Sequence, residues 1–311
     1  MRDLRVLFMG TPDYAVPILR ALMDEFQVIS VVTQPDQPVG RGKHIQAPPV
    51  KLEAQKCGLS VLQPEKIRTE VFHQVLVSLN PDMIVVAAYG KILPKSTLEF
   101  PRYGCLNVHA SVLPRWRGAA PIHSAILYGD TTYGASIMLM DEGVDTGPLL
   151  ATADVTIDAS DTSADLSAKI AMVGADLLVK AIPAYIKGEL TPKLQDEQNA
   201  TYTKLLKKED GRLDFRQEAK YLERQVRACN PWPIGFFNWD GQALRVWKAA
   251  VLPTRSLEIG CCGIRDRYPC VGTGSTDLKL LEVQPAGKRM MSGLDFLNGV
   301  RDWASKTVSE I

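Results

Sequence analysis

The sequence predicts an α/β protein with a Rossmann-like, mostly parallel sheet in an N-terminal domain and an OB-like β-barrel in a C-terminal domain. Three observations predict this fold. Short apolar runs alternate with amphipathic helical segments in the first half of the chain, which is typical of a parallel sheet covered by helices. The run 82–88, DMIVVAA, is a nearly continuous apolar run, as expected of a strand buried on both faces. Beyond residue 216, short β-like runs punctuated by Gly and Asp replace the alternation and indicate a small all-β module.

The first half begins with a strand at 5–9 and a helix at 12–26, with Thr11 as the expected N-cap and Pro12 in the first turn. The later elements alternate in the same way: a strand at 27–33, a helix at 66–80 ended by Pro81, strands at 82–88 and 105–110, a helix near 118–128, a strand at 135–140 and a helix at 161–187 with Asp161 as its cap. Ligands bind outside the carboxyl ends of strands in such sheets, so a site is expected at the ends of 82–88, 105–110 and 135–140.

The pattern changes at a polar segment in the second half. Residues 188–203 show no apolar period, which is typical of a linker. A short helix near 216–228 then precedes the β-like runs of the C-terminal module. We therefore expect an N-terminal domain over 1–189, a linker over 190–205 and an OB-like domain over 206–311.

Charge is distributed unevenly along the chain. The net charge of all 311 residues is +1, but residues 1–200 hold 18 Lys and Arg against 22 Asp and Glu, whereas residues 201–311 hold 18 against 13. The balances of −4 and +5 indicate that the C-terminal third would meet a polyanionic partner. An ordinary mixed surface explains the charge equally well when nothing else is considered.

The composition argues against several classes of protein. With 46% hydrophobic and 23% charged residues, the chain resembles a globular protein with a full core. No apolar run approaches the roughly 20 residues that span a membrane, so no membrane contact and a cytoplasmic location are expected. The six cysteines lack zinc-ligand spacing, and the segments FMGTPD and GTGSTD lack the features of a dinucleotide-binding loop. Neither a metal nor a nucleotide cofactor is expected.

Asn107 and His109 stand two residues apart on the predicted strand 105–110. Side chains alternate along a strand, so the two share one face and lie roughly 7 Å apart. An amide and an imidazole directed at one point suit the oxyanion that forms when a carbonyl carbon becomes tetrahedral. For an Asn-x-His pair considered in isolation, the favoured interpretation is that both side chains satisfy local backbone groups.

A loop rich in carboxylates follows the next strand. The segment 138–150, MLMDEGVDTGPLL, carries Asp141, Glu142 and Asp145, and one of them could orient the histidine and take a proton from a nucleophile. The alternative is an Asx-turn role for one or more of them. No Ser or Cys lies in a nucleophile elbow, so direct acyl transfer to an external nucleophile is favoured.

Two further loops carry basic residues. Residues 111–122, SVLPRWRGAAPI, hold Arg115 and Arg117 between two prolines and could grip an anionic or planar ligand, or simply lead into a helix. Residues 33–51 form a long Pro- and Gly-rich loop whose basic tip suits the end of a nucleic acid. A mobile solvated loop is an equal alternative on charge alone.

These motifs together resemble a known family. NVHASVLPRWRGAAPI followed by MDEGVDTG is similar to the signature of the folate-dependent formyltransferases. The resemblance narrows to the branch that formylates methionyl-tRNA, because it extends over nearly the whole chain: FMGTPDYAVPIL, TQPDQPVGRGK, VAAYGKILP, NATYTKLLKKEDGRLDF, RACNPWPIGFF and VQPAGKRMMS.

The resemblance implies a reaction and a set of residues. The α-amino group of methionyl-initiator-tRNA would attack the formyl carbon of 10-formyltetrahydrofolate, the co-substrate. By family analogy, Asn107 and His109 stabilise the oxyanion, and Asp145 sets the state of His109 and assists proton transfer. The further residues implied are Ser111, Val112, Leu113 and Pro114 at the folate, Arg41, Gly42 and Lys43 at the acceptor end of the tRNA, and Lys204, Lys207 and Lys208 at its acceptor arm. A monomer is expected.

Two alternatives belong to other functional classes. A formyltransferase for a sugar-nucleotide amine is disfavoured by the basic loop 38–44 and by the C-terminal charge. An RNA-binding protein on an inactive scaffold is disfavoured by the complete set of Asn107, His109 and Asp145.

Overall fold

The computed structural model describes residues 3–39, 44–300 and 302–308. Contacts within the chain divide it into two compact units. Unit 1 comprises residues 1–121, 132–156 and 167–203, and unit 2 comprises residues 122–131, 157–166 and 204–311. Two short stretches that precede residue 167 therefore belong with the C-terminal unit.

Unit 1 is built on a seven-stranded sheet in the order β10-β9-β7-β6-β1-β2-β5. Its strands are β1 (Arg5–Gly10), β2 (Gln27–Val32), β5 (Val61–Leu62), β6 (Met83–Ala87), β7 (Cys105–His109), β9 (Thr132–Leu139) and β10 (Leu149–Thr156). The five strands from β7 to β5 run parallel, which confirms the mostly parallel α/β fold.

Strand β9 is antiparallel to both of its neighbours. Leu139 pairs with Leu106 and Ser136 pairs with His109, so the carboxyl end of β9 lies beside the amino end of β7. The expectation that the ends of 105–110 and 135–140 share one edge of the sheet is therefore wrong. An apolar run has the same pattern in either direction, so the sequence of β9 did not reveal its orientation.

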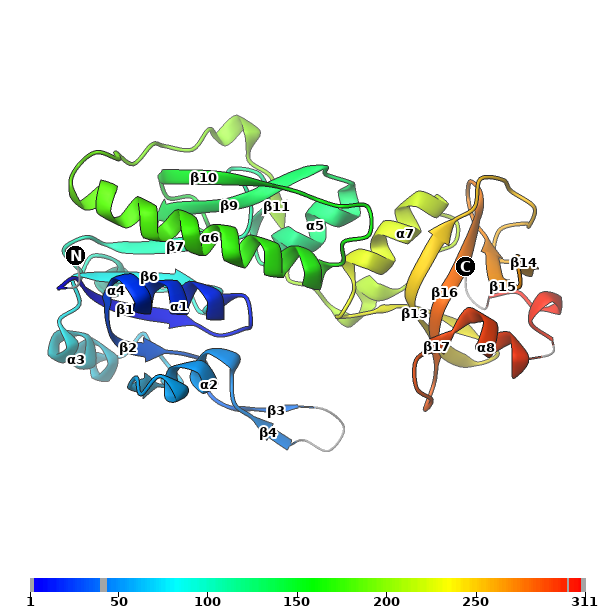
Figure 1. Cartoon of the computed structure of the whole chain (residues 1–311), viewed down its shortest axis with the longest axis horizontal. Helices are drawn as coiled ribbons and strands as arrows, with labels where there is room; N and C mark the ends of the chain where they lie inside the picture. Colours follow the sequence, from blue (N-terminus) through cyan, green and yellow to red (C-terminus); the bar gives the residue numbers. More distant parts are fainter. Residues whose placement is uncertain (1–2, 40–43, 301, 309–311) are drawn as a thin grey trace. The chain divides into compact units, whose positions relative to one another are not determined.

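Helices cover both faces of this sheet. The helices up to residue 186 are α1 (Ala15–Glu25), α2 (Pro49–Lys56), α3 (Glu70–Leu79), α4 (Lys95–Leu98), α5 (Pro121–Tyr128) and α6 (Ser163–Ile186), and of these α5 belongs mostly to unit 2. On one face, α6 runs along β7 and β9, where a Cβ on its Gly174 would lie 2.8 Å from Val108 (Figure 1). On the other face, Phe72 and Leu76 of α3 pack in one apolar cluster with Ile84 and Val86 of β6. Strand β7 is consequently buried along its whole length.

Two helix starts differ from the sequence prediction. Helix α1 begins at Ala15, because the Thr11 hydroxyl donates to the Tyr89 carbonyl at 3.0 Å instead of capping the helix. At the start of α6, the Thr162 hydroxyl accepts the Asp165 N–H, and the Asp165 carboxylate accepts the Thr162 N–H. The Asp161 carboxylate, which was expected to cap this helix, accepts the Asp158 N–H instead. In both cases a side chain with capping chemistry is used for another contact.

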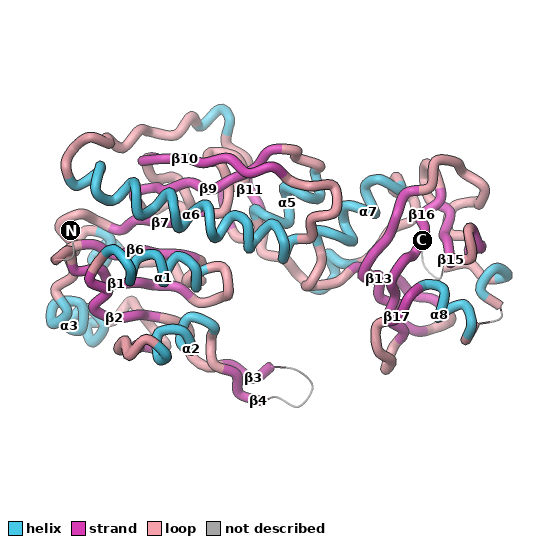
Figure 2. Tube along the Cα trace, viewed as in Figure 1, coloured by secondary structure: helices cyan, strands magenta, loops and turns pink. Residues whose placement is uncertain are grey.

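A hairpin projects from the edge of unit 1. Its strands are β3 (Gln37–Val39) and β4 (His44–Gln46), and Figure 2 shows them extending beyond α2. The tip of the hairpin, with Arg41, Gly42 and Lys43, lies outside the described residues. The long basic loop of the sequence is thus carried on a β-ribbon.

The polar segment after α6 is fastened to unit 1. Lys193 exchanges two backbone hydrogen bonds with Leu149, and β11 (Tyr202–Thr203) pairs in parallel with β8 (Arg117–Gly118). A short 3₁₀ helix, Glu197–Asn199, lies between these attachments. Residues 193–203 are called the strap below.

Unit 2 contains an antiparallel sheet in the order β12-β13-β16-β15-β14, with β17 paired to β16. Its elements are a 3₁₀ turn Lys208–Gly211, α7 (Ala219–Ala228), β12 (Gly235–Trp239), β13 (Gln242–Val251), β14 (Cys262–Arg265), β15 (Tyr268–Gly272), β16 (Asp277–Pro285), β17 (Met291–Ser292), α8 (Gly293–Asn298) and a 3₁₀ turn Trp303–Ser305. Leu222 and Val226 of α7 pack into the same core as Phe237 and Trp303. Within the described ranges, no helix has both the length and the apolar character needed to cross a membrane.

Candidate active site

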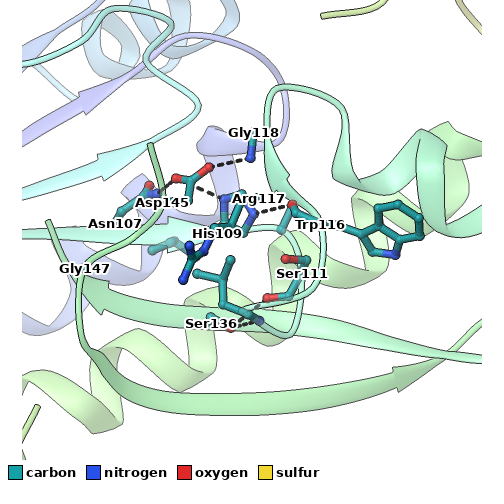
Figure 3. Close-up of polar contacts among 12 residues, drawn as sticks. Asn107, His109, Ser111, Trp116, Arg117, Gly118, Ser136, Asp145 and Gly147 are labelled. Atoms are coloured by element: carbon teal, nitrogen blue, oxygen red, sulfur yellow. Dashed lines mark hydrogen bonds and ion pairs between the residues drawn. The ribbon is translucent and has the colours of Figure 1, made fainter. Parts of the chain in front are cut away.

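Two donor side chains project from the same face of β7. Asn107 and His109 are both buried, at 9% and 6% exposure, because β7 lies between β6 and β9. Their side chains meet one carboxylate oxygen: Asp145 Oδ1 lies 3.4 Å from Asn107 Nδ2 and 3.5 Å from His109 Nδ1 (Figure 3). The structure therefore brings together the three residues that the sequence predicted as catalytic.

Asp145 reaches this position because the loop after β9 folds back along β7. The backbone of Asp145 is left-handed, with φ 53°, and its second carboxylate oxygen accepts the Gly118 N–H at 2.8 Å. The other two acidic residues of the loop have different roles. Asp141 accepts from the Gly143 N–H and the Thr146 hydroxyl, which is the Asx-turn alternative, and Glu142 pairs with Lys95 at 3.4 Å.

His109 is held at both ring nitrogens. Nδ1 faces Asp145, and Nε2 lies 3.1 Å from the carbonyl oxygen of Trp116. Carbonyl and carboxylate oxygens only accept, so His109 acts as an N–H donor toward both when it is doubly protonated. The Trp116 carbonyl is fixed by backbone geometry, since Trp116 has φ 62° and its indole is buried under the Arg115 guanidinium at 4.2 Å.

The turn predicted to line the folate site follows His109 directly. Ser136 of β9 donates to the Ser111 carbonyl at 2.7 Å and accepts the Leu113 N–H at 3.0 Å, which fixes the turn against the sheet. Ser111 and Leu113 are buried, whereas Val112 and Pro114 are half-buried. Val112 and Pro114 are thus the members of this turn that offer side-chain surface.

A hollow of about 590 Å³ opens in unit 1 beside the loop of Asp145. Its size falls in the range of small-molecule pockets. Arg68 and His73 line one side, and Leu93 and Pro94 line another, together with Glu142. A second hollow of about 440 Å³ shares Lys95 and Glu142 with the first. The loop that supplies Asp145 therefore also borders space for an elongated ligand.

Nucleophilic catalysis by a thiol has no support at this strand. Cys105 begins β7, but it is buried, and burial raises the pKa of its thiol to about 12. The neutral thiol donates to the Thr97 and Leu98 carbonyls. In the described part of the chain, no group of three or more His, Cys, Asp or Glu is arranged to hold a metal ion.

The basic residues predicted for nucleic-acid contact belong to two segments, the start of the C-terminal stretch of unit 2 and the β3–β4 hairpin. Lys204, Lys207 and Lys208 are exposed in unit 2, at the start of that unit's long C-terminal stretch. The tip residues of the β3–β4 hairpin lie outside the described residues, as stated above.

Three parts of the site were missed by sequence reasoning. Ser136 fixes the turn after His109, the Trp116 carbonyl holds the imidazole, and the Gln195 side chain contacts the loop of Asp145. A serine within a predicted strand and a glutamine within a polar segment have no distinctive pattern. The only local signal is the Pro114–Gly118 turn, whose unusual composition indicates constrained backbone.

Family models match both parts of the chain. One described as "Formyl transferase" covers residues 4–182, and one described as "Formyl transferase, C-terminal domain" covers residues 205–301. Among curated relatives, the methionyl-tRNA formyltransferase of Bacillus licheniformis is 46% identical over 95% of both chains. That of Myxococcus xanthus is 47% identical, also over 95% of both chains.

Solved structures share the fold at much lower identity. A sugar 3N-formyl transferase, WlaRD, solved in the presence of dTDP and 5-N-formyl-THF, matches 93% of this chain and 100% of its own with a TM-score of 0.65 and 16% identity. HypX from Aquifex aeolicus in complex with tetrahydrofolic acid matches 97% of this chain and 48% of its own with a TM-score of 0.63 and 15% identity.

Proposed function

The chain belongs to the formyl transferase family, among its methionyl-tRNA formyltransferases, and from this membership we propose how its residues carry out the reaction. The protein formylates initiator methionyl-tRNA from a folate donor. We propose 10-formyltetrahydrofolate as that donor and the acceptor arm as the part of the tRNA that is bound, by a monomer in the cytoplasm.

The proposed chemistry is a direct attack. The α-amino nitrogen of the methionyl group bonds to the formyl carbon, the carbonyl oxygen becomes an oxyanion, and the bond to the folate nitrogen then breaks. Tetrahydrofolate leaves with a proton in place of the formyl group, and the attacking nitrogen loses one proton. Asn107 and His109 supply N–H donors to the oxyanion, and Asp145 accepts the proton from the amine.

The observation that carries this proposal is the unequal hold on the two oxygens of Asp145. Oδ2 is anchored by the Gly118 N–H at 2.8 Å, whereas the contacts of Oδ1 with Asn107 and His109 are long, at 3.4 and 3.5 Å. A formyl oxygen that enters the site can displace Oδ1 from these donors without releasing the carboxylate. Oδ1 is then oriented to accept the proton while both donors serve the oxyanion.

The folate is proposed to lie against Ser111–Pro114, with the turn held by Ser136. Val112 and Pro114 supply its half-buried apolar surface. The hollow bordered by Glu142, on the loop that supplies Asp145, has room for the elongated remainder of the co-substrate. We propose that Arg41, Gly42 and Lys43 contact the acceptor end of the tRNA from the β3–β4 hairpin, and that Lys204, Lys207 and Lys208 contact its phosphates.

Purified protein with 10-formyltetrahydrofolate and charged initiator tRNA tests the function. We expect rapid formation of formylmethionyl-tRNA, measured by acid gel or mass spectrometry. An amino-sugar nucleotide is offered in a parallel reaction as the competing acceptor. Turnover of the amino sugar alone would overturn the proposal, and so would tRNA binding without turnover.

A further inference from the structure

The strap holds both groups that contact His109. The Thr201 hydroxyl accepts the Trp116 N–H at 2.8 Å, next to the carbonyl that faces His109 Nε2. At the other end of the strap, Gln195 contacts the loop of Asp145, which faces Nδ1. The strap lies more than 80 residues after His109 in the sequence, and it braces the groups on both sides of the imidazole.

Gln195 is a half-buried residue within an exposed stretch of the chain. Residues 191–194 and 196–199 on either side of it are exposed. Its amide nitrogen donates to the carbonyl oxygens of Asp145 and Gly147, at 2.8 and 2.7 Å. One side chain therefore joins the carbonyl groups of the two residues that flank Thr146.

The orientation of this amide is fixed by Arg117. The Gln195 oxygen accepts from Nε and Nη2 of Arg117, at 3.1 and 2.9 Å. A guanidinium only donates and a carbonyl only accepts, so the amide cannot be reversed without placing like groups against each other. Gln195 is consequently held as a connector between Arg117 and the loop.

Arg117 is itself immobilised. Its side chain has no exposed surface, and it forms a two-pronged pair with Glu197 at 2.7 and 2.9 Å and a further bond to the Tyr202 hydroxyl at 3.1 Å. The hydrogen bond from Arg117 lowers the pKa of Glu197, and the same bond raises the pKa of Arg117. Both groups therefore stay charged at neutral pH.

From this chain of contacts, we infer that Gln195 is a positioning residue that places the Asp145 carboxylate for proton transfer. It acts through the backbone of Asp145 and does not touch the reacting atoms. The inference rests on the proposed function and deepens it, because it assigns a catalytic task to a segment that looks like a linker. The two bonds from Gln195 hold the loop at the point where the backbone of Asp145 is left-handed.

The variant Gln195→Glu separates positioning from simple support. Its carboxylate still accepts from Arg117, so the strap stays attached, but it offers oxygen instead of N–H to the Asp145 and Gly147 carbonyls. We expect kcat to fall roughly ten- to a hundredfold, since a displacement of about 1 Å costs that much. We expect KM for both substrates to stay within about twofold. Gln195→Ala should behave in the same way.

The matched control is Gln198→Ala, an exposed glutamine of the same strap, which should retain the wild-type rate. A second readout is hydrogen exchange at the Gly118 amide, which should become roughly tenfold faster in Gln195→Glu because its acceptor is Asp145 Oδ2. In an Asp145→Ala background, Gln195→Ala should cause no further loss of rate.

Three results would overturn the inference. They are a wild-type kcat in Gln195→Glu, unchanged exchange at Gly118, or an equal loss of rate with and without Asp145. Failure of the wild-type chain to formylate methionyl-tRNA would instead overturn the proposed function, and the inference with it. Thermal unfolding of each variant shows whether the fold is preserved.

Discussion

At the scale of single residues, the site depends on how many N–H groups of Asn107 and His109 are left to bind the formyl oxygen. An amide carries two N–H groups, and Asp145 takes one of those on Asn107. The second can meet the formyl oxygen from the start of the reaction. His109 must exchange an acceptor to do so, because both of its nitrogens already face oxygen atoms. Asn107 is therefore the donor that is immediately available.

Asn107→Ala removes that donor without adding bulk to β7. We expect kcat to fall about 10²–10³-fold, as for other single oxyanion donors, with KM for the folate changed by less than about threefold. Single-turnover formylation measures the chemical step. Asn298→Ala, at an exposed asparagine of unit 2, is the control. A loss below tenfold would contradict the role given to Asn107.

Arg41→Ala tests the tip of the β3–β4 hairpin. A charge-assisted contact with a phosphate or base is lost, so kcat/KM for methionyl-tRNA should fall roughly tenfold. The dissociation constant of the folate should not change, and titration with a folate analogue measures it. Arg102→Ala, which removes an exposed cation stacked on Tyr103, should leave both values intact. An equal loss of folate affinity would show that the hairpin serves the folate pocket.

At the scale of elements, the direction of β9 decides how Asp145 arrives. Because β9 runs antiparallel to β7, its loop starts beside Leu106 and must turn back to reach His109. Glycine makes this return possible. A Cβ on Gly147 would lie 1.9 Å from the Leu139 carbonyl oxygen, so any side chain there pushes the loop away from the end of β9.

Gly147→Ala should therefore displace Asp145 and lower kcat at least tenfold. Gly188→Ala is the matched control, because a Cβ there meets nothing within 4 Å and only the left-handed backbone, φ 76°, resists it. That strain costs about 1–2 kcal/mol of stability and should leave kcat unchanged. Steady-state rates and melting temperatures of the two variants distinguish loop displacement from general destabilisation. Equal rates in both would refute the account of the loop.

At the scale of the whole molecule, charge is divided between the two parts of the sequence. The positive balance of residues 201–311 fits a substrate whose backbone is a polyanion, and Lys204, Lys207 and Lys208 are exposed at its beginning. Contacts of this kind release counterions, so binding weakens as salt rises.

Replacing Lys204, Lys207 and Lys208 together by Ala should reduce the slope of log Kd against log salt by up to about 2–3. Filter binding or fluorescence titration over a range of salt measures the slope. Alanine at Lys66, Lys180 and Lys187, three exposed lysines of unit 1, should change it by less than about 1. An unchanged slope in the first variant would remove these lysines from the tRNA-binding surface.

The sequence by itself determined the parts of this protein that depend on local pattern. Short apolar runs predicted the strands β1, β6 and β7, and the continuous run of β6 predicted a strand buried on both faces, because such strands admit few polar groups. The period of two along β7 placed Asn107 and His109 on one face. The polar, aperiodic character of residues 188–203 predicted a linker, and most of this segment is exposed.

Only the tertiary structure decided what joins these parts. The orientation of β9, the return of its loop and the Gln195 contact with Asp145 depend on residues 30 to 50 positions apart. Such contacts leave no period in the sequence, and a polar glutamine facing inward looks like any other polar residue. The fold makes Gln195 inward-facing because the buried Arg117 requires acceptors, and the strap brings them to it.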